Sequence, residues 1–565
     1  HQNLISGNLW FGVDLFESSD FVGQSSGNVL TGNYIGTDIS GSARLGNASG
    51  GILFNGSGNR IGGANEDDRN LVSGNLGSGI VIFDPDGTIA SIGNTVIGNW
   101  VGLTSTGDDT LGNLGTGIRI AGSSNRVGGP GPGEGNVVAA SSFAAISIRG
   151  DETPDSVAHN IVQGNLLGTN GDGSKAFGNV EDGVAIIQSK DNTIGGKEPA
   201  EGNLMAGNLG GVFIFGQEST GNLVQGNQIG IDTEGTTGLS NREWGVDIFE
   251  AVDNAVVGNL IANNGIAGVN VTNVRPAGKR TRRYASTVTA TRDGHGELRY
   301  APVSPGLKAE WPAKARSKST QVGEGNRIVD NRIFNNVFYG IDLGQDGPTP
   351  NDPGDPDDGP NRRQNFPDLE EATVDQTKVR VMLNLPSTTS NTTYPVEIGI
   401  YLADDLGQGS DPLQTVVLPA TNAEESVEFI FDTDEPLEPG SRVVATATDA
   451  EGNTSEFSEP IEVEAGPVSV EEDGAVPGAL RLLPNFPNPV ANSTTIQYDL
   501  DVATEVTISI YDGLGREVDR LLDRVARPVG TSEVTVSTAE LSSGVYTLVL
   551  EAGGRRRSLS MMVVK

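Results

Sequence analysis

Short runs of alternating apolar and polar residues, separated by Asn and Gly, fill the first two-thirds of the chain. The pattern Asn-x-aliphatic-x-Gly-Asn-x-aliphatic-Gly begins at Asn28, Asn94, Asn160 and Asn222, so it recurs after 66, 66 and 62 residues. Alternation with a period of two over a few residues predicts short β-strands with aliphatic side chains on one face. Asn and Gly predict sharp corners between them, because both residues tolerate left-handed backbone conformations.

A second element, Gly or Ala followed by aliphatic-x-aliphatic, occurs twice in each repeating unit. One such strand per coil predicts about ten coils stacked about 4.8 Å apart. A single coil cannot bury its own apolar face, so the coils must stabilise one another by stacking. The ten strands begin at Gly12, Gly51, Gly79, Gly117, Ala145, Gly183, Gly211, Gly245, Gly268 and Gly340.

These repeats resemble those of right-handed parallel β-helix proteins from bacterial secretomes, over about residues 1–345. The predicted fold class is all-β: a right-handed parallel β-helix solenoid of about ten coils, followed by two small antiparallel β-sandwich domains. The resemblance implies a fold and not an activity, because the family contains polysaccharide lyases, glycoside hydrolases, adhesins and inert surface fibres.

One segment interrupts the repeats. Between Arg275 and Lys318 there are eleven Lys and Arg residues against three acids, a net charge of 11 − 3 = +8. We predict that residues 275–322 form a basic insertion loop outside the coils. Such a loop could bind an acidic polysaccharide or the acidic surface of the chain itself, and it could equally have no function.

Four regions follow the repeats. Residues 346–367, rich in Asp, Pro and Gly, predict an acidic linker, and residues 368–465 alternate between turns as expected for an immunoglobulin-like β-sandwich. Residues 466–482 predict a second linker. Residues 483–565 predict another small β-sandwich with a Pro-rich entry.

The last region contains four ordered motifs. They are PNPVANSTTIQY at 487–498, IYDGLGREV at 510–518, LSSGVY at 541–546 and the terminal Lys565. Together they resemble the type A sorting domain of type IX secretion. The resemblance implies that the type IX secretion machinery is a partner. It also implies that the protein is secreted or held on the outer-membrane surface of a Gram-negative, Bacteroidota-like bacterium.

Composition narrows the possible partners and chemistry. The formal net charge is −36, which makes nucleic acid and anionic membranes unsuitable partners. The chain has no Cys and only three His residues, so disulfides, thiolate metal sites and His-based triads are not expected. No stretch is long and apolar enough to predict a transmembrane segment.

The strands suggest one carboxylate site. Asp247, Asn270 and Asp342 occupy the middle position of three successive Gly-aliphatic-x-aliphatic strands, so alternation predicts that they point outward on consecutive coils. Asp247 and Asp342 would then lie about 10 Å apart, slightly beyond the carboxylate separation of inverting glycosidases. They are the candidate catalytic residues, with Asn270 and Arg119 as candidate ligand-binding residues. The alternative is that outward Asp residues are simply solvated.

The acidic linker suggests a second site. Closely spaced carboxylates in a loop rich in Gly and Pro can supply the oxygen ligands that calcium prefers, and a solvated linker is the alternative. The candidate calcium ligands are Asp352, Asp355, Asp357, Asp358 and Asn361.

Three functions remain open on the sequence. The first is a non-catalytic surface protein that adheres to or binds an extracellular polysaccharide or surface glycan. The second is a carbohydrate-active enzyme, a glycoside hydrolase or a polysaccharide lyase. A lyase would need a basic residue and a neutralised uronate, and Arg119, Lys190 and Lys197 are isolated from one another in the repeats. The third is a passive surface spacer.

Overall fold

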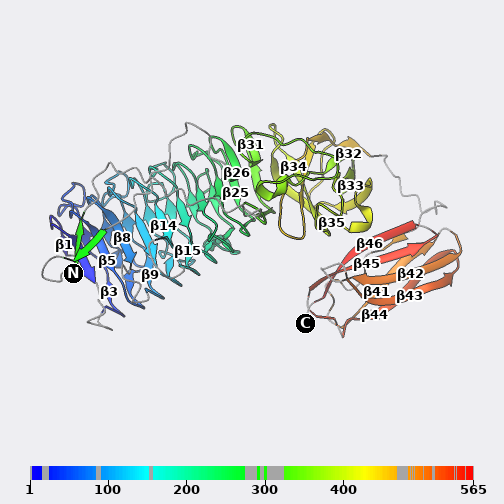
Figure 1. The fold of residues 1–565 in the computed structure, drawn as a ribbon, viewed down its shortest axis with the longest axis horizontal. Coiled ribbons are helices and arrows are strands. Elements are labelled where there is room, and N and C mark those ends of the chain that lie inside the picture. Colours follow the sequence, from blue (N-terminus) through cyan, green and yellow to red (C-terminus); the bar gives the residue numbers. More distant parts are fainter. Residues whose placement is uncertain are drawn as a thin grey trace. The chain divides into compact units, whose positions relative to one another are not determined.

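The computed structural model is all-β and consists of two compact units, residues 1–466 and 467–565 (Figure 1). The structure describes residues 3–563 apart from 16–24, 84–90, 152–156, 274–288, 293–297, 302–322, 467–480, 484, 486–487, 489, 491, 501, 512–515, 540, 543 and 554.

Three parallel sheets wind through the first unit and form the predicted β-helix. Sheet A contains β1 (Leu4–Ile5), β4 (Tyr34–Ile35), β7 (Leu71–Val72), β10 (Trp100–Val101), β13 (Val137–Val138), β16 (Leu166–Leu167), β19 (Leu204–Met205), β22 (Gln228–Ile229), β25 (Leu260–Ala262) and β30 (Arg332–Phe334). Sheet B contains β2 (Phe11–Leu15), β5 (Gly50–Phe54), β8 (Ser78–Phe83), β11 (Ile118–Ala121), β14 (Ile146–Arg149), β17 (Val184–Ile187), β20 (Val212–Phe215), β23 (Val246–Phe249), β26 (Ala267–Thr272) and β31 (Tyr339–Leu343). Sheet C contains β3 (Val29–Leu30), β6 (Arg60–Gly62), β9 (Thr95–Ile97), β12 (Arg126–Gly128), β15 (Ile161–Gln163), β18 (Thr193–Gly195), β21 (Leu223–Gln225), β24 (Ala255–Val257) and β29 (Arg327–Val329).

The ten strands of sheet B are the ten predicted Gly-aliphatic-x-aliphatic elements, and they pair in sequence order, so the predicted fold class is confirmed. Their inward aliphatic side chains join those of sheets A and C in one buried core that runs the length of the β-helix. The repeated Gly lies where sheet B meets sheet A. A Cβ at Gly117 would lie 2.2 Å from Cγ1 of Val138, so the close approach of the two sheets requires Gly there.

Each corner carries a ladder of asparagines. Along the C–A ladder, which runs from Asn3 to Asn331, the side-chain Nδ2–H of each Asn donates to Oδ1 of the Asn on the next coil. The B–C ladder runs in the same way from Asn28 to Asn326. The A–B ladder runs from Asn8 to Asn336, with Ser141 at one coil. The ladders satisfy backbone and side-chain polar groups that the corners bury.

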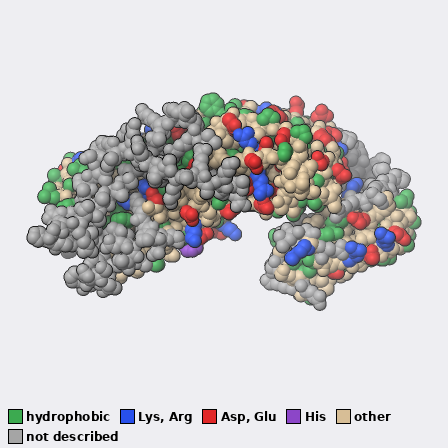
Figure 2. Space-filling view, in the orientation of Figure 1, with side chains coloured by type: hydrophobic (Ala, Val, Ile, Leu, Met, Phe, Trp, Pro, Cys, Tyr) green, Lys and Arg blue, Asp and Glu red, His purple; other side chains and the backbone are tan. Residues whose placement is uncertain are grey.

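A sandwich of two β-sheets closes the C-terminal end of the β-helix. One sheet contains β36 (Val427–Asp432), β33 (Lys378–Asn384), β32 (Asp368–Asp375) and β39 (Glu464–Ala465), and the other β35 (Gly409–Leu418), β34 (Val396–Ala403), β37 (Arg442–Thr448) and β38 (Ile461–Glu462). Phe457 packs against the end of the β-helix core. Gln408 takes the place of the next ladder residue: its Oε1 accepts from Nδ2 of Asn336 at 3.0 Å. The sandwich therefore completes the last coil, and its visible face mixes many Asp and Glu side chains with fewer Lys and Arg (Figure 2).

The second unit is a small sandwich of antiparallel strands. One sheet contains β40 (Arg481–Leu482), β41 (Ser493–Leu500) and β44 (Gly530–Ser537), and the other β43 (Glu517–Arg527), β42 (Thr504–Tyr511), β45 (Gly544–Ala552) and β46 (Arg555–Val563). Four short 3-10 helices complete the described elements: Glu66–Asp68, Pro199–Glu201, Pro360–Arg363 and Ala420–Asn422.

Most of the basic insertion at 275–322 lies outside the described residues. Within it the structure describes one antiparallel hairpin, β27 (Thr289–Arg292) paired with β28 (Leu298–Ala301). The interpretation of the remainder as a loop stays a prediction.

Candidate functional site

The predicted carboxylate site lies on sheet B, in the predicted register. Asp247 on β23 aligns with Asn270 on β26, and Asn270 aligns with Asp342 on β31. Nδ2 of Asn270 donates a hydrogen bond to Oδ1 of Asp247 at 2.6 Å. The three side chains are therefore on consecutive coils, as expected.

The expectation that these residues are solvated is wrong. Asp247, Asn270 and Asp342 are 5, 0 and 3% exposed. Their neighbours on the outer face of sheet B are buried as well, and aromatic and aliphatic side chains form two clusters there. One cluster contains Phe11, Leu53, Val81, Phe83 and Ala121, and the other Ala144, Ala185, Ile187, Phe213, Phe215 and Phe249. Asp247 and Asp342 therefore lie in a buried, largely apolar layer, and their catalytic role stays a prediction.

Arg119 lies on the same buried face. Its guanidinium stands over the ring of Phe83, 5.0 Å from the centroid, and the side chain is 6% exposed. Burial, followed by the positive charge of Arg149, lowers the pKa of Arg119 to about 9, against the opposing charge of Asp151. Arg149 itself forms a bidentate ion pair with Asp151. Arg119 is therefore a buried cation, and its role in ligand binding stays a prediction.

The predicted calcium ligands separate into different environments. Asp355 is buried and accepts hydrogen bonds from Ser387 at 2.9 Å and Thr392 at 2.6 Å. Burial raises the pKa of Asp355, and these hydrogen bonds lower it in part. Oδ1 of Asn361 accepts from the backbone N–H of Asn326 at 3.0 Å, so Asn361 ends the B–C ladder.

A cavity of about 320 Å³ remains beside these residues, between the last coil and the sandwich. Asp355, Asp357, Asp358 and Glu324 line it together with Arg362. The guanidinium of Arg362 pairs with Glu324 at 3.2 Å and with Glu451 at 2.8 Å. In the part of the chain that the structure describes, no three His, Asp or Glu residues are gathered closely enough to hold a metal ion. Calcium binding stays a prediction.

Four loops of equal length lie on the flank of sheet A. Residues 36–47, 102–113, 168–179 and 230–241 follow β4, β10, β16 and β22, on every second coil. We call them the stacked loops. Each is closed by one antiparallel bridge, and each turns at a Gly with φ between 69 and 78°, a conformation that favours Gly. The bridges are Thr37–Arg44, Leu103–Thr110, Thr169–Ala176 and Ile231–Gly238.

Side chains inside the loops hold their shape. Oδ1 of Asp38 accepts from the N–H of Ser42 and of Ala43, both at 3.1 Å. Oδ1 of Asp232 accepts from the N–H of Thr236 at 2.9 Å in the fourth loop. The hydrogen bond from Ser40, followed by the N–H of Ala43, lowers the pKa of Asp38, so this side chain stays ionised as an acceptor.

The loops also bind one another. The N–H of Ser105 donates to O of Gly41 at 3.0 Å, and its hydroxyl donates to O of Ser40 at 2.8 Å. The N–H of Gly171 donates to O of Gly107 at 3.1 Å. The ring of Trp100 packs against Gly107. The guanidinium of Arg69 lies over the same ring, 4.1 Å from its centroid. The stacked loops therefore form one continuous, ordered surface.

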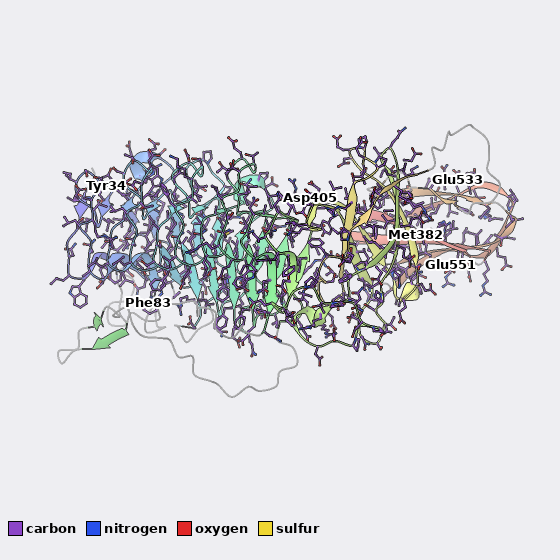
Figure 3. The ribbon with its side chains drawn as sticks, turned by 90° about the horizontal axis from the view of Figure 1, so that it is seen from above. Tyr34, Phe83, Met382, Asp405, Glu533 and Glu551 are labelled. Carbon is purple, nitrogen blue, oxygen red and sulfur yellow. The ribbon has the colours of Figure 1, made fainter. Side chains whose placement is uncertain are left out.

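The stacked loops were not among the predicted site residues. They lie on the opposite side of the β-helix from the predicted carboxylate site, as the positions of Tyr34 on sheet A and Phe83 on sheet B show (Figure 3). Most exposed polar side chains of the loops carry hydroxyls or carboxylates, Arg44 and Lys175 are exposed basic residues, and the apolar Ile39 is 83% exposed. The exposed hydroxyl and carboxylate residues are Ser40, Ser42, Thr106, Asp108, Asp109, Thr110, Asp172, Ser174, Thr233, Glu234, Thr236, Thr237 and Ser240.

Comparison with known proteins identifies the second unit. Residues 485–565 match the model of the secretion system C-terminal sorting domain family. The predicted sorting domain is thus confirmed, and it indicates a secreted or cell-surface protein of Bacteroidota that interacts with the type IX secretion machinery. No curated protein matches the chain. Among the described residues no helix is long and apolar enough to cross a membrane.

Solved structures resemble parts of the chain. Dimeric latent PorU from Porphyromonas gingivalis is 19% identical with a TM-score of 0.14, and the match covers 36% of this chain and 21% of PorU. The human OSCAR ligand-binding domain is 13% identical with a TM-score of 0.13, covering 35% of this chain and 97% of that domain. The BSP domain of a biofilm-associated protein is 13% identical with a TM-score of 0.13, covering 35% of this chain and 29% of that one.

Proposed function

We propose that this exported β-helix protein is a non-catalytic surface adhesin that binds an extracellular polysaccharide along the stacked loops. The observation that supports this function is the regular array of exposed hydroxyl and carboxylate groups on the stacked loops. Hydroxyls and carboxylates are the groups that exchange hydrogen bonds with sugar hydroxyls.

The spacing of the loops suits a polymer. Loops on every second coil place equivalent groups about 10 Å apart along the β-helix. A chain of repeating sugars can meet several equivalent groups at once, so weak contacts add through an increased effective concentration. Because the hydrogen bonds between loops hold the array in place, binding does not have to order it first.

The enzyme alternative has weaker support than the adhesin. Asp247 and Asp342 are buried beneath the outer face of sheet B, and a hydrolase needs both carboxylates at the sugar. The passive spacer differs from the adhesin in one measurable respect, since a spacer binds no polysaccharide.

Affinity electrophoresis and a glycan array on the purified full chain test the proposal. We expect at least one extracellular polysaccharide to bind. Replacing Asp108, Asp172 and Ser174 by Ala should weaken binding at least tenfold, because these exposed side chains sit on two adjacent loops. The matched control is Thr95→Ala with Thr193→Ala, two half-buried hydroxyls on sheet C.

Three results would contradict the proposal. The first is binding to no polysaccharide, which would favour the spacer. The second is an equal loss of binding in the control variant. The third is release of reducing sugars or unsaturated uronates from a bound polysaccharide, which would establish an enzyme.

A further inference from the structure

The outer face of sheet B carries aromatic rings and carboxylates that are both buried. The rings of Phe213 and Phe215 stack with their centroids 5.9 Å apart, and those of Phe215 and Phe249 at 5.5 Å. On the same face Asp247 is 5% exposed and Asp342 is 3% exposed. A side chain on the outer face of a sheet is buried only where another part of the chain covers it. Sheet B therefore has a covering layer, and its charge and length requirements can be compared with the rest of the chain.

Four segments that lie wholly or mostly outside the described residues follow strands of sheet B. Residues 16–24 follow β2, residues 84–90 follow β8, residues 152–156 follow β14, and the basic insertion, residues 275–322, follows β26. The first three segments contain two acids each and no Lys or Arg, whereas the basic insertion has a net charge of +8. Of these segments, the basic insertion is by far the longest and the one whose charge is opposite to that of the chain.

The charge of the face is opposite to that of the basic insertion. The last five strands of sheet B, namely β17, β20, β23, β26 and β31, contain two Asp residues and no Lys or Arg. A carboxylate is stable as a buried anion only beside hydrogen-bond donors and cations. Asn270 on β26 supplies one hydrogen bond to Asp247. The first cation of the basic insertion, Arg275, comes three residues after β26 ends at Thr272.

We propose that the basic insertion docks on the outer face of sheet B of its own chain. Its Arg and Lys side chains would neutralise the carboxylates of the face, and its three large aromatic residues would pack on the phenylalanine rings. These residues are Tyr284, Tyr300 and Trp311.

The length of the chain allows this placement. From β26 to β2 sheet B measures about 38 Å, which is eight strand spacings. Residues 274–288, which precede β27, can extend over about 50 Å. The hairpin of β27 and β28 lies on the same side of the β-helix as Phe83 (Figure 3). The stacked loops lie on the opposite side, so the docked insertion is independent of the proposed adhesion.

Carboxyl footprinting of the full chain tests the proposal. A carbodiimide couples glycine ethyl ester to accessible carboxylates, and mass spectrometry gives the labelling rate of each residue. We expect Asp247 and Asp342 to label at least tenfold more slowly than Asp108 and Asp172, the exposed carboxylates of the stacked loops. Labelling of Asp247 and Asp342 as fast as Asp108 would leave the basic insertion available to an external polyanion and would overturn the proposal.

A charge reversal in the insertion identifies what covers the face. The variant Arg280→Glu, Arg282→Glu and Arg283→Glu changes residues outside the coils and should label Asp247 and Asp342 at least tenfold faster than the parent chain. The matched control reverses three exposed arginines of the second unit, Arg516→Glu, Arg520→Glu and Arg524→Glu, and should label like the parent chain.

A deletion gives an independent measurement. Five residues, 250–254, connect β23 to β24, and removal of residues 274–322 leaves five between β26 and β29, namely Asn273 and residues 323–326. The deleted chain can therefore close its coil as the preceding coil does. It should label Asp247 and Asp342 at least tenfold faster than the parent chain and leave the rates of Asp108 and Asp172 unchanged. Rates for Asp247 and Asp342 that neither the charge reversal nor the deletion alters would mean that another part of the chain covers the face and would overturn the proposal.

Discussion

The C–A ladder offers a direct measurement of how the coils hold together, through Asn165→Ala. Oδ1 of Asn165 accepts from the backbone N–H and from Nδ2 of Asn136, both at 3.0 Å. Its Nδ2 donates to O of Val127 at 3.0 Å and to Oδ1 of Asn203 at 2.9 Å. The side chain is fully buried.

Alanine removes these bonds and leaves the backbone N–H of Asn136 without its acceptor inside the protein. A buried group left in this way costs about 1–3 kcal/mol, and the small cavity adds to that cost, so we expect a loss of about 2–4 kcal/mol. In a stacked repeat the loss is concentrated on neighbouring coils. The amides of β13 and β16 should then exchange with solvent about 30- to 1000-fold faster, because about 1.4 kcal/mol corresponds to a factor of ten.

Hydrogen–deuterium exchange read by mass spectrometry resolves these strands and checks the estimate. The matched control is Gln163→Ala on the same coil, which removes one hydrogen bond from a half-buried side chain, Nε2 to O of Gly195 at 3.0 Å. We expect the control to cost under about 1 kcal/mol. If Asn165→Ala accelerated exchange at β13 and β16 less than threefold, the ladder would not hold the coils together.

Three further outcomes are expected. Glu456 accepts the N–H of Leu343 at 2.7 Å. Burial, with a smaller contribution from the charge of Asp342, raises the pKa of Glu456 from 4.5 to about 7 against that hydrogen bond. Its contribution to the free energy of unfolding is therefore complete below about pH 4.5 and decreases by about 3 kcal/mol as the pH rises from 4.5 through 7. The difference in unfolding free energy between the parent chain and Glu456→Gln should change over that range and stay constant below pH 4.5. Deleting residues 467–565 should leave the melting midpoint of the first unit unchanged and abolish surface delivery; surface labelling equal to that of the intact protein would contradict the sorting role. If calcium binds in the cavity beside the last coil, a chelator should lower the melting midpoint of the parent chain and leave the melting midpoint of Asp357→Asn unchanged. An equal decrease in both proteins would mean that any bound calcium lies elsewhere.

The sequence predicted the coils because each one repeats the same physical requirements. Gly recurs where a Cβ would overlap the neighbouring sheet, as at Gly117, and Asn recurs where a corner buries polar backbone, as at Asn165. Requirements that recur every coil leave a periodic pattern in the sequence, so the fold class, the number of coils and the register of Asp247 with Asn270 could all be predicted.

The surroundings of the predicted site could not be obtained in this way. Strand alternation places Asp247 on the outer face, but only the neighbouring coils decide whether that face meets solvent. Leu53, Val81 and Phe213 occupy the same column as Asp247 and were visible in the sequence, and their apolar character already indicated a buried layer. Asn361 and Gln408 act once each at the end of a ladder, so no repetition marked their roles.

The ladders also govern how such a chain can change in length during evolution. Removing residues 94–159 would bring Asn59 against Asn160 in the B–C ladder, Asn70 against Asn165 in the C–A ladder and Asn75 against Asn179 in the A–B ladder. Every donor would again meet an asparagine oxygen, and the first stacked loop would meet the third. A deletion that removed only part of a coil would misalign at least one corner. Gain and loss of two coils together keep both the ladders and the alternation of the stacked loops, so these are neutral steps open to this protein, and each changes the length of the β-helix by about 10 Å.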